Sequence, residues 1–136
     1  MARYGKGASA ERELMRLFSS AGFAVVRSAG SGKSQLPCPD VVVLNNGKVL
    51  SFECKAWRSK HLVISEQQMS DLFKWQSLSG SSTFVAWKFP NKGWFFVPIA
   101  CFSKNKHYSI SFDLARKVSV PFEVIVGRQF RLFEKC

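Results

Sequence analysis

Acidic residues, paired cysteines and long apolar runs are all scarce in this sequence. Its apolar runs fall well short of the roughly 20 residues that a membrane-spanning helix needs, and its N-terminus lacks the apolar core of a signal peptide. The four cysteines have neither the spacing of a zinc site nor that of a disulfide framework, so we expect reduced thiols. These absences predict a cytoplasmic protein that does not act at a membrane.

The residues that are present describe a folded, basic domain. The 136 residues suffice for one domain with its own core, and the 13 Phe and 4 Trp exclude an intrinsically disordered chain. The 20 Lys and Arg outnumber the 9 Asp and Glu, and the formal net charge of +11 indicates a polyanionic partner. No segment pairs a basic face with a wide apolar face, as a membrane-surface helix would. Nucleic acid is therefore the expected partner.

Helical and strand patterns alternate along the chain. We expect a helix capped by Ser9 and ended by Gly22, a second one capped by Ser65 and ended by Gly80, and a short third one over 112–117. Strand patterns cover 23–27, 40–45, 48–56, 83–89 and 94–97, and the segment 120–127 resembles a late strand or an interface segment. This order predicts an α/β fold with a central mixed sheet flanked by helices. We expect a single domain over 1–136 whose last ten or so residues form a flexible tail.

Asn46-Gly47 sets the register of the first hairpin. Asn-Gly between apolar runs is the strongest short-range signal for a two-residue turn. With these residues in the turn, the residue numbers of each directly opposed pair add up to 93. Asp40 therefore faces Glu53, with Cβ atoms roughly 4.5–5.5 Å apart. Lys55 lies on the same face as Glu53, because side chains alternate along a strand. The other face of the hairpin is wholly apolar, and we expect both faces to be largely covered.

Two opposed carboxylates on a covered surface need compensation. At about 4 Å and an effective dielectric near 20, their repulsion is on the order of 4 kcal/mol. One acid could be protonated, Lys55 could bridge the pair, or a divalent cation could lie between the acids. Oxygen donors without a nearby Cys/His set favour Mg²⁺ or Mn²⁺ over zinc, and such an ion can promote hydrolysis of a phosphodiester. A plain Glu53–Lys55 surface salt bridge is the simpler alternative, but the register and the apolar face favour the metal site.

Glu11 lies on the inward face of the expected first helix. It shares that face with Leu14, Met15 and Phe18. Its position could reflect the favourable interaction of a carboxylate with a helix N-terminus. Alternatively, it could reach Asp40 and Glu53 and help to hold the metal.

The spacing of these acids also matches a known nuclease motif. Pro39-Asp40, twelve residues and Glu53-Cys54-Lys55 follow the PD-(D/E)xK pattern. The segments GKGASAEREL, GFAVVRSAGSG, PDVVV, FECKA, ISEQQM, VAWKF and GWFFVP follow in the right order, and through them residues 4–98 resemble archaeal Holliday junction resolvases. The resemblance implies a restriction-endonuclease-like fold and a homodimeric endonuclease, acting in the nucleoid of an archaeal-type cell. Such an enzyme resolves four-way DNA junctions with Mg²⁺, or with Mn²⁺ in its place, by paired nicks in opposing strands.

The resemblance also implies roles for individual residues. Glu11, Asp40, Glu53 and Lys55 are the expected catalytic residues. Asp40, Glu53 and the backbone carbonyl of Cys54 are the expected metal ligands, with Glu11 as a further one. Residues of the family that contact DNA or assist cleavage correspond to Arg12, Arg27, Ser28 and Ser31. Basic side chains near the site add the expected DNA contacts Lys6, Lys33, Arg58 and Lys60.

Two other functions compete with junction resolution. A restriction- or repair-type nuclease of the same superfamily would use the same residues on duplex or flap DNA. An inactive architectural DNA-binding protein is the alternative without catalysis. The complete set of Asp40, Glu53 and Lys55 favours an enzyme, because a binding protein gains nothing from covered charges.

Overall fold

A computed structural model describes residues 2–28 and 36–127, with side chains from Gly7 onward. Ser31, Lys33 and the expected C-terminal tail lie outside the described residues. The elements are, in chain order, α1 (Ala2–Ser20), β1 (Ala24–Arg27), β2 (Val41–Asn45), β3 (Lys48–Ala56), β4 (His61–Ile64), α2 (Glu66–Ser79), β5 (Ser82–Phe89), β6 (Gly93–Pro98), the 3-10 turn η1 (Ile99–Cys101), β7 (Ser103–Lys104), β8 (Tyr108–Ser111), α3 (Phe112–Val118) and α4 (Phe122–Ile125). Within the described residues, no helix is long and apolar enough to cross a bilayer.

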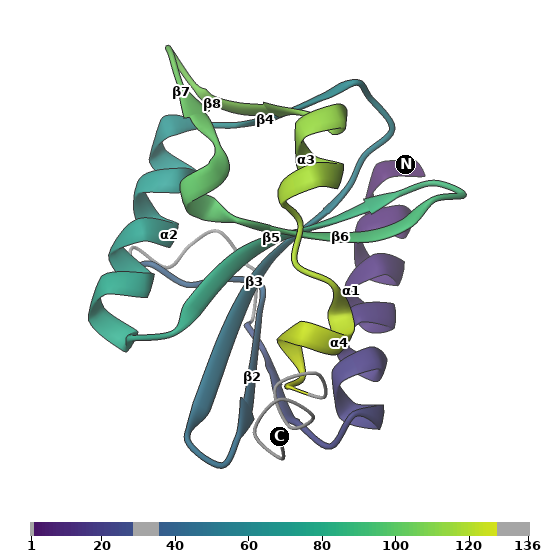
Figure 1. The fold of residues 1–136 in the computed structure, drawn as a ribbon, viewed down its shortest axis with the longest axis vertical. Helices are drawn as coiled ribbons and strands as arrows, with labels where there is room; N and C mark the ends of the chain where they lie inside the picture. Colours follow the sequence, from purple (N-terminus) through teal and green to yellow (C-terminus); the bar gives the residue numbers. More distant parts are fainter. Residues whose placement is uncertain (1, 29–35, 128–136) are drawn as a thin grey trace, which may run out of the picture.

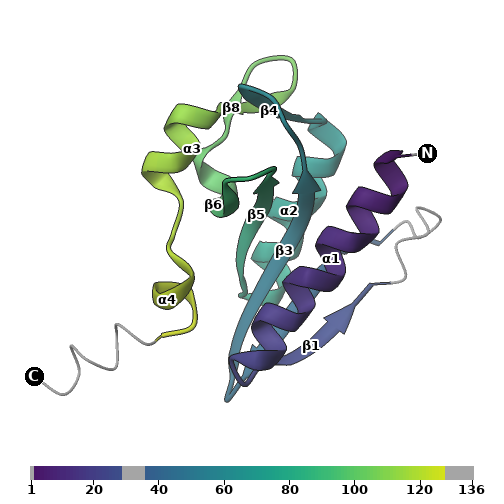
Figure 2. The same ribbon diagram turned by 90° about the vertical axis from the view of Figure 1, so that its right-hand side faces the viewer.

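A mixed five-stranded sheet forms the centre of the fold, as the sequence predicts. Its strand order is β1-β2-β3-β5-β6, in which β3 and β5 are parallel and the other neighbours antiparallel. Helix α1 lies on one face of this sheet, and α2 lies on the other (Figures 1 and 2). A smaller sheet of order β4-β8-β7 extends the α2 side. Strand β3 is thus central and covered on both faces, which is the setting expected for Glu53.

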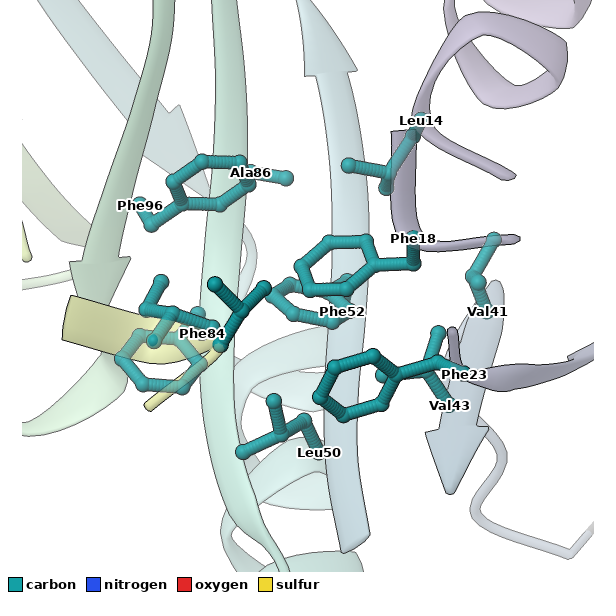
Figure 3. Close-up of a cluster of buried hydrophobic side chains, with 12 residues drawn as sticks. Leu14, Phe18, Phe23, Val41, Val43, Leu50, Phe52, Phe84, Ala86 and Phe96 are labelled. Atoms are coloured by element: carbon teal, nitrogen blue, oxygen red, sulfur yellow. The ribbon is translucent and has the colours of Figure 1, made fainter. Parts of the chain in front are cut away.

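Two apolar cores, one on each face, hold the central sheet in place. On the α1 side, Leu14 and Phe18 point from the helix toward Val41 and Phe52 (Figure 3). The Phe18 and Phe52 rings lie 4.8 Å apart between centroids. On the other side, Met69 and other α2 residues pack on alternate residues of β5 and β6. Each core removes a large apolar area from water, which is the main stabilising contribution to such a fold.

The first hairpin has the predicted register. Asn45 pairs with Lys48 and Val41 pairs with Phe52, so the numbers of opposed residues add up to 93. Asn46 and Gly47 both have positive φ, 47° and 83°, as a type I′ turn requires. The turn residues therefore fix which side chains of β3 face Asp40.

Helix α2 also begins and ends where the sequence predicts. The Ser65 side chain accepts a hydrogen bond from the Gln68 backbone N–H, and Gly80 closes the helix with φ 71°. These caps satisfy backbone groups at the helix ends that have no partner within the helix. The N-cap determines where Gln68, one turn into the helix, meets β3.

Two expectations are wrong, and one sheet is not predicted at all. Helix α1 begins at Ala2, so Ser9 lies inside the helix and does not cap it; the alanines around it favour helix. Segment 120–127 contains α4 and no strand, because Pro121 favours a helix start and Phe122 packs on Phe18. The small sheet is absent from the prediction, since its strands are short and β4 pairs with β8 across more than 40 residues, as His61 does with Ser111.

Candidate active site

Asp40 is positioned by the strand opposite it. It directly precedes β2, and its carboxylate oxygen Oδ2 accepts a hydrogen bond from the Cys54 backbone N–H at 2.9 Å. Its own carbonyl accepts from the Ser28 N–H, also at 2.9 Å. These two bonds tie the start of β2 both to β3 and to the end of β1. The Asp40 carboxylate therefore lies against the part of β3 that carries Glu53.

Glu53 is a buried acid with another acid beside it. The residue is only 7% exposed. Burial is the largest cause that raises the pKa of its carboxyl, to about 8, and the negative charge of Asp40 is the next. Burial also raises the pKa of Asp40, and the charge of Glu11 adds to this effect. The structure thus brings together the two carboxylates that the sequence pairs, in surroundings that disfavour two negative charges.

Lys55 offsets only part of the unfavourable negative charge of the Asp40–Glu53 pair. Its Nζ lies 3.9 Å from Glu53 Oε2, and its charge lowers the pKa of both Asp40 and Glu53. The pKa of Glu53 nevertheless stays near 8. A bridging lysine, one of the three ways of relieving the repulsion, is therefore present but insufficient. Proton uptake or a bound cation has to supply the remainder.

Gln68 connects helix α2 to both reactive side chains of β3. Its Nε2 donates to Glu53 Oε2 at 2.5 Å, and its Oε1 accepts from Lys55 Nζ at 3.2 Å. This role is not evident from the sequence, in which the capping motif that contains Gln68 predicts only the start of α2. One amide thus orients the Glu53 carboxyl group and the Lys55 ammonium group at once, which makes Gln68 a positioning residue.

Glu11 reaches the same site from helix α1. Its charge raises the pKa of Asp40 and Glu53, so it lies close enough to influence both. Its Oε1 accepts from Arg27 Nε at 2.8 Å, which holds the arginine at the edge of the site. The interpretation of Glu11 as an inward residue is consistent with its partly buried position.

Among the remaining candidates whose side chains the structure describes, only Ser28 contacts this centre. Arg58 lines a pocket with Glu13 and Lys88, and Lys60 lines another pocket near α3. Ser28 is half-buried beside Asp40, and Lys6 lies in α1. The exposed ones are Arg12 on α1 and, after β3, Arg58 and Lys60. Burial raises the pKa of the Cys54 thiol, which therefore stays protonated and is a poor ligand. Among residues 2–28 and 36–127, no group of three or more His, Cys, Asp and Glu side chains is arranged to hold a metal, so the candidate centre is the Asp40–Glu53 pair.

Comparison with known proteins identifies similar chains. The family model described as archaeal Holliday junction resolvase (Hjc) matches residues 2–132. The chain is 32% identical to the crossover junction endodeoxyribonuclease Hjc of Methanocaldococcus jannaschii, over 93% of this chain and 90% of that protein. It is 36% identical to the Hjc of Archaeoglobus fulgidus over 74% of each. A solved structure of an A. fulgidus Holliday junction resolvase superposes with a TM-score of 0.80 at 28% identity, covering 90% of this chain and 96% of that one.

Proposed function

Because the chain belongs to the archaeal Holliday junction resolvase family, we propose that its Asp40–Glu53 pair binds the divalent cation of that reaction. The chain is an endodeoxyribonuclease that resolves four-way DNA junctions, an activity of recombination and repair. The observation that carries the proposal is the placement of two acids together: the Asp40 carboxylate, held by the Cys54 N–H, lies beside the buried Glu53 and raises the pKa of its carboxyl. A divalent cation would offset both the burial and the neighbouring Asp40 charge that disfavour ionisation of Glu53.

The donors at the site fit Mg²⁺. Asp40 and Glu53 offer carboxylate oxygens, the ligands that Mg²⁺ prefers. The Cys54 thiol is kept neutral by burial, which argues against a thiolate-binding metal. We assign the Cys54 carbonyl as a third ligand, with Mn²⁺ as a chemically similar substitute, while Glu11, whose carboxylate bonds Arg27, acts on the site through its negative charge. When bound, the cation supplies an acidified water and neutralises charge that develops on the phosphate.

The side chains around the pair then have distinct roles. Lys55, held by Gln68 and Glu53, donates a hydrogen bond to a phosphate oxygen as its negative charge grows, which stabilises the transition state. The Glu11–Arg27 pair turns the guanidinium toward the DNA backbone. Further phosphate contacts come from Arg12, Ser28, Arg58 and Lys60, together with Lys6, Ser31 and Lys33.

A homodimer supplies the two active sites that a four-way junction requires. The junction has approximate two-fold symmetry, and a C₂ dimer presents two equivalent sites for cuts in opposing strands. Val26 and Leu44 support this proposal, because they are 54% and 38% exposed on the sheet face opposite α1. Exposed apolar side chains on a sheet face are typical of an interface.

Cleavage of a plasmid-borne cruciform tests substrate, cofactor and subunit number together. The first nick relaxes supercoiling and removes the cruciform, so linear product requires two cuts in one encounter. We expect linear plasmid with Mg²⁺, no product with EDTA, and no cleavage of a linear duplex of the same sequence. Equal cleavage of the linear duplex would favour a restriction- or repair-type nuclease. Nicked circles as the only product would contradict the dimer.

Replacement of Gln68 tests its positioning role. Gln68→Leu leaves Glu53 and Lys55 without their shared partner, and we expect cleavage to fall about 10- to 100-fold with a higher Mg²⁺ requirement. Gln67→Leu is the matched control, because Gln67 lies on the same turn but bonds Asp71. The measurement is a Mg²⁺ titration of junction cleavage, with thermal unfolding of both variants. A Gln68→Leu enzyme with the wild-type Mg²⁺ midpoint would contradict the assignment.

A further inference from the structure

A basic pocket lies outside the active site. It has a volume of about 520 Å³, and its lining includes Lys60, His61, Lys92, Asp113 and Arg116. Three lysine and arginine side chains thus surround one carboxylate. Phe89 and Phe112 also line the pocket, with their ring centroids 4.3 Å apart. Lys60, Lys92 and Arg116 form the cationic rim of this pocket, beside its two aromatic rings. Such a lining suits a phosphodiester better than an apolar ligand.

Local contacts hold the cationic residues at the rim. The Arg116 guanidinium lies over the Phe112 ring, 5.4 Å from its centroid, and Nη2 is 3.1 Å from Asp113 Oδ1. The Phe112 backbone N–H donates to the Lys60 carbonyl at 2.7 Å, which joins α3 to the segment after β3. The N–H of Lys92 donates to the Phe89 carbonyl in the β5–β6 turn. The backbone of each rim residue is therefore fixed, although the side chains reach solvent.

The pocket lies on the same side of the central sheet as the active site. Lys55 pairs with Trp87 in the β3–β5 register, and Phe89 is two residues further, so it shares that face. The segment 57–60 leads directly from β3 to the pocket, and α3 lies beside β4 (Figure 1). A DNA strand that is cut at the Asp40–Glu53 pair, beside Lys55, and continues past the end of β3 would pass over this rim.

We propose that this pocket binds the phosphate backbone of a junction arm, as a second contact beyond the scissile phosphate. This inference rests on the proposed function, since it takes its direction from the position of the Asp40–Glu53 pair. It adds Lys92 and Arg116, from the C-terminal half of the chain, to the DNA-binding surface. It also implies that Asp113 opposes binding, because its negative charge weakens the attraction between the pocket and DNA phosphates.

Binding of an uncut junction measures the pocket separately from catalysis. In EDTA, we expect Lys92→Glu/Arg116→Glu to weaken binding of a fluorescent four-way junction at least about 10-fold and to reduce the salt slope by about two. Lys92→Gln/Arg116→Gln, which removes charge without reversing it, is expected to lose less. Asp113→Asn is expected to bind about two- to threefold more tightly. Shortening the junction arms until they no longer reach the pocket is expected to abolish these differences.

A matched control separates the pocket from overall charge. Lys74→Glu/Lys117→Glu changes the net charge equally at two exposed lysines of α2 and α3 that do not line the pocket. We expect its affinity to remain within about threefold of wild type. Equal losses in the two charge-reversed proteins, or a loss that persists with shortened arms, would overturn the proposal. Because the assay contains no divalent cation, an error in the Asp40–Glu53 assignment would leave these binding results unchanged.

Discussion

Asp40→Asn is expected to abolish junction cleavage while leaving junction binding intact or tighter. The asparagine keeps an oxygen that can accept the Cys54 N–H bond, so the substitution removes the charge and little else. Without that charge, the pair loses its affinity for a divalent cation, and we expect the single-turnover cleavage rate to fall at least about 1,000-fold. Removal of one negative charge from a basic DNA-binding surface cannot weaken its attraction for phosphate. The measurement pairs single-turnover cleavage in Mg²⁺ with binding in EDTA.

The same substitution is expected to stabilise the metal-free protein. Asp40 raises the pKa of Glu53 through its charge, and Asp40→Asn removes this repulsion. Loss of activity with a gain in stability is the pattern of a strained functional site, whereas damage to the fold would lower both. Asp71→Asn on α2 is the matched control, since Asp71 bonds Gln67 away from the pair. Full cleavage by Asp40→Asn would refute the metal site.

The sequence predicts the centre of this site because local signals determine it. Asn46-Gly47 sets the hairpin register, and that register alone places Asp40 against Glu53 and Lys55 on their face. The helical period places Glu11 inward. Each of these inferences spans a single element or one tight turn, where steric rules leave few alternatives.

Contacts between distant elements could not be predicted in this way. Gln68 meets Glu53 only because α2 packs on the sheet, and its place in a capping motif gives no hint of a second partner. Glu13 likewise contacts Lys88 and Trp94, more than 70 residues away. The β-branched residues around α4 favour a strand, but packing of Phe122 on Phe18 outweighs that propensity. These contacts depend on how the helices pack on the sheet, and the hydrophobic periodicity of a single segment does not reveal that packing.

The stability of the metal-free protein is expected to fall as pH rises from 5 to 9. The folded-state pKa of Glu53 is about 8, above the ordinary value of 4.5, so the folded protein binds more protons than the unfolded chain in this range. Its contribution to stability is complete below pH 4.5 and is lost as pH rises through about 8. The raised pKa of Asp40 acts in the same direction. Urea unfolding in EDTA is expected to show a loss of at least about 2 kcal/mol between pH 5 and 9.

Glu53→Gln should remove most of this dependence, because a neutral amide has no proton to release. Glu66→Gln is the control at an exposed acid, whose side chain is 62% accessible and pairs with Lys104; it should retain the wild-type slope. The lowered pKa of Glu13 stabilises the fold above about pH 4.5, and this contribution is lost only as pH falls below that value, outside this window. Mg²⁺ should reverse the trend in the wild type, since the cation binds the ionised pair and its stabilising effect grows with pH. A metal-free stability that is flat or rising between pH 5 and 9 would mean that the two acids ionise without strain, and the physical reason for a cation between them would be gone.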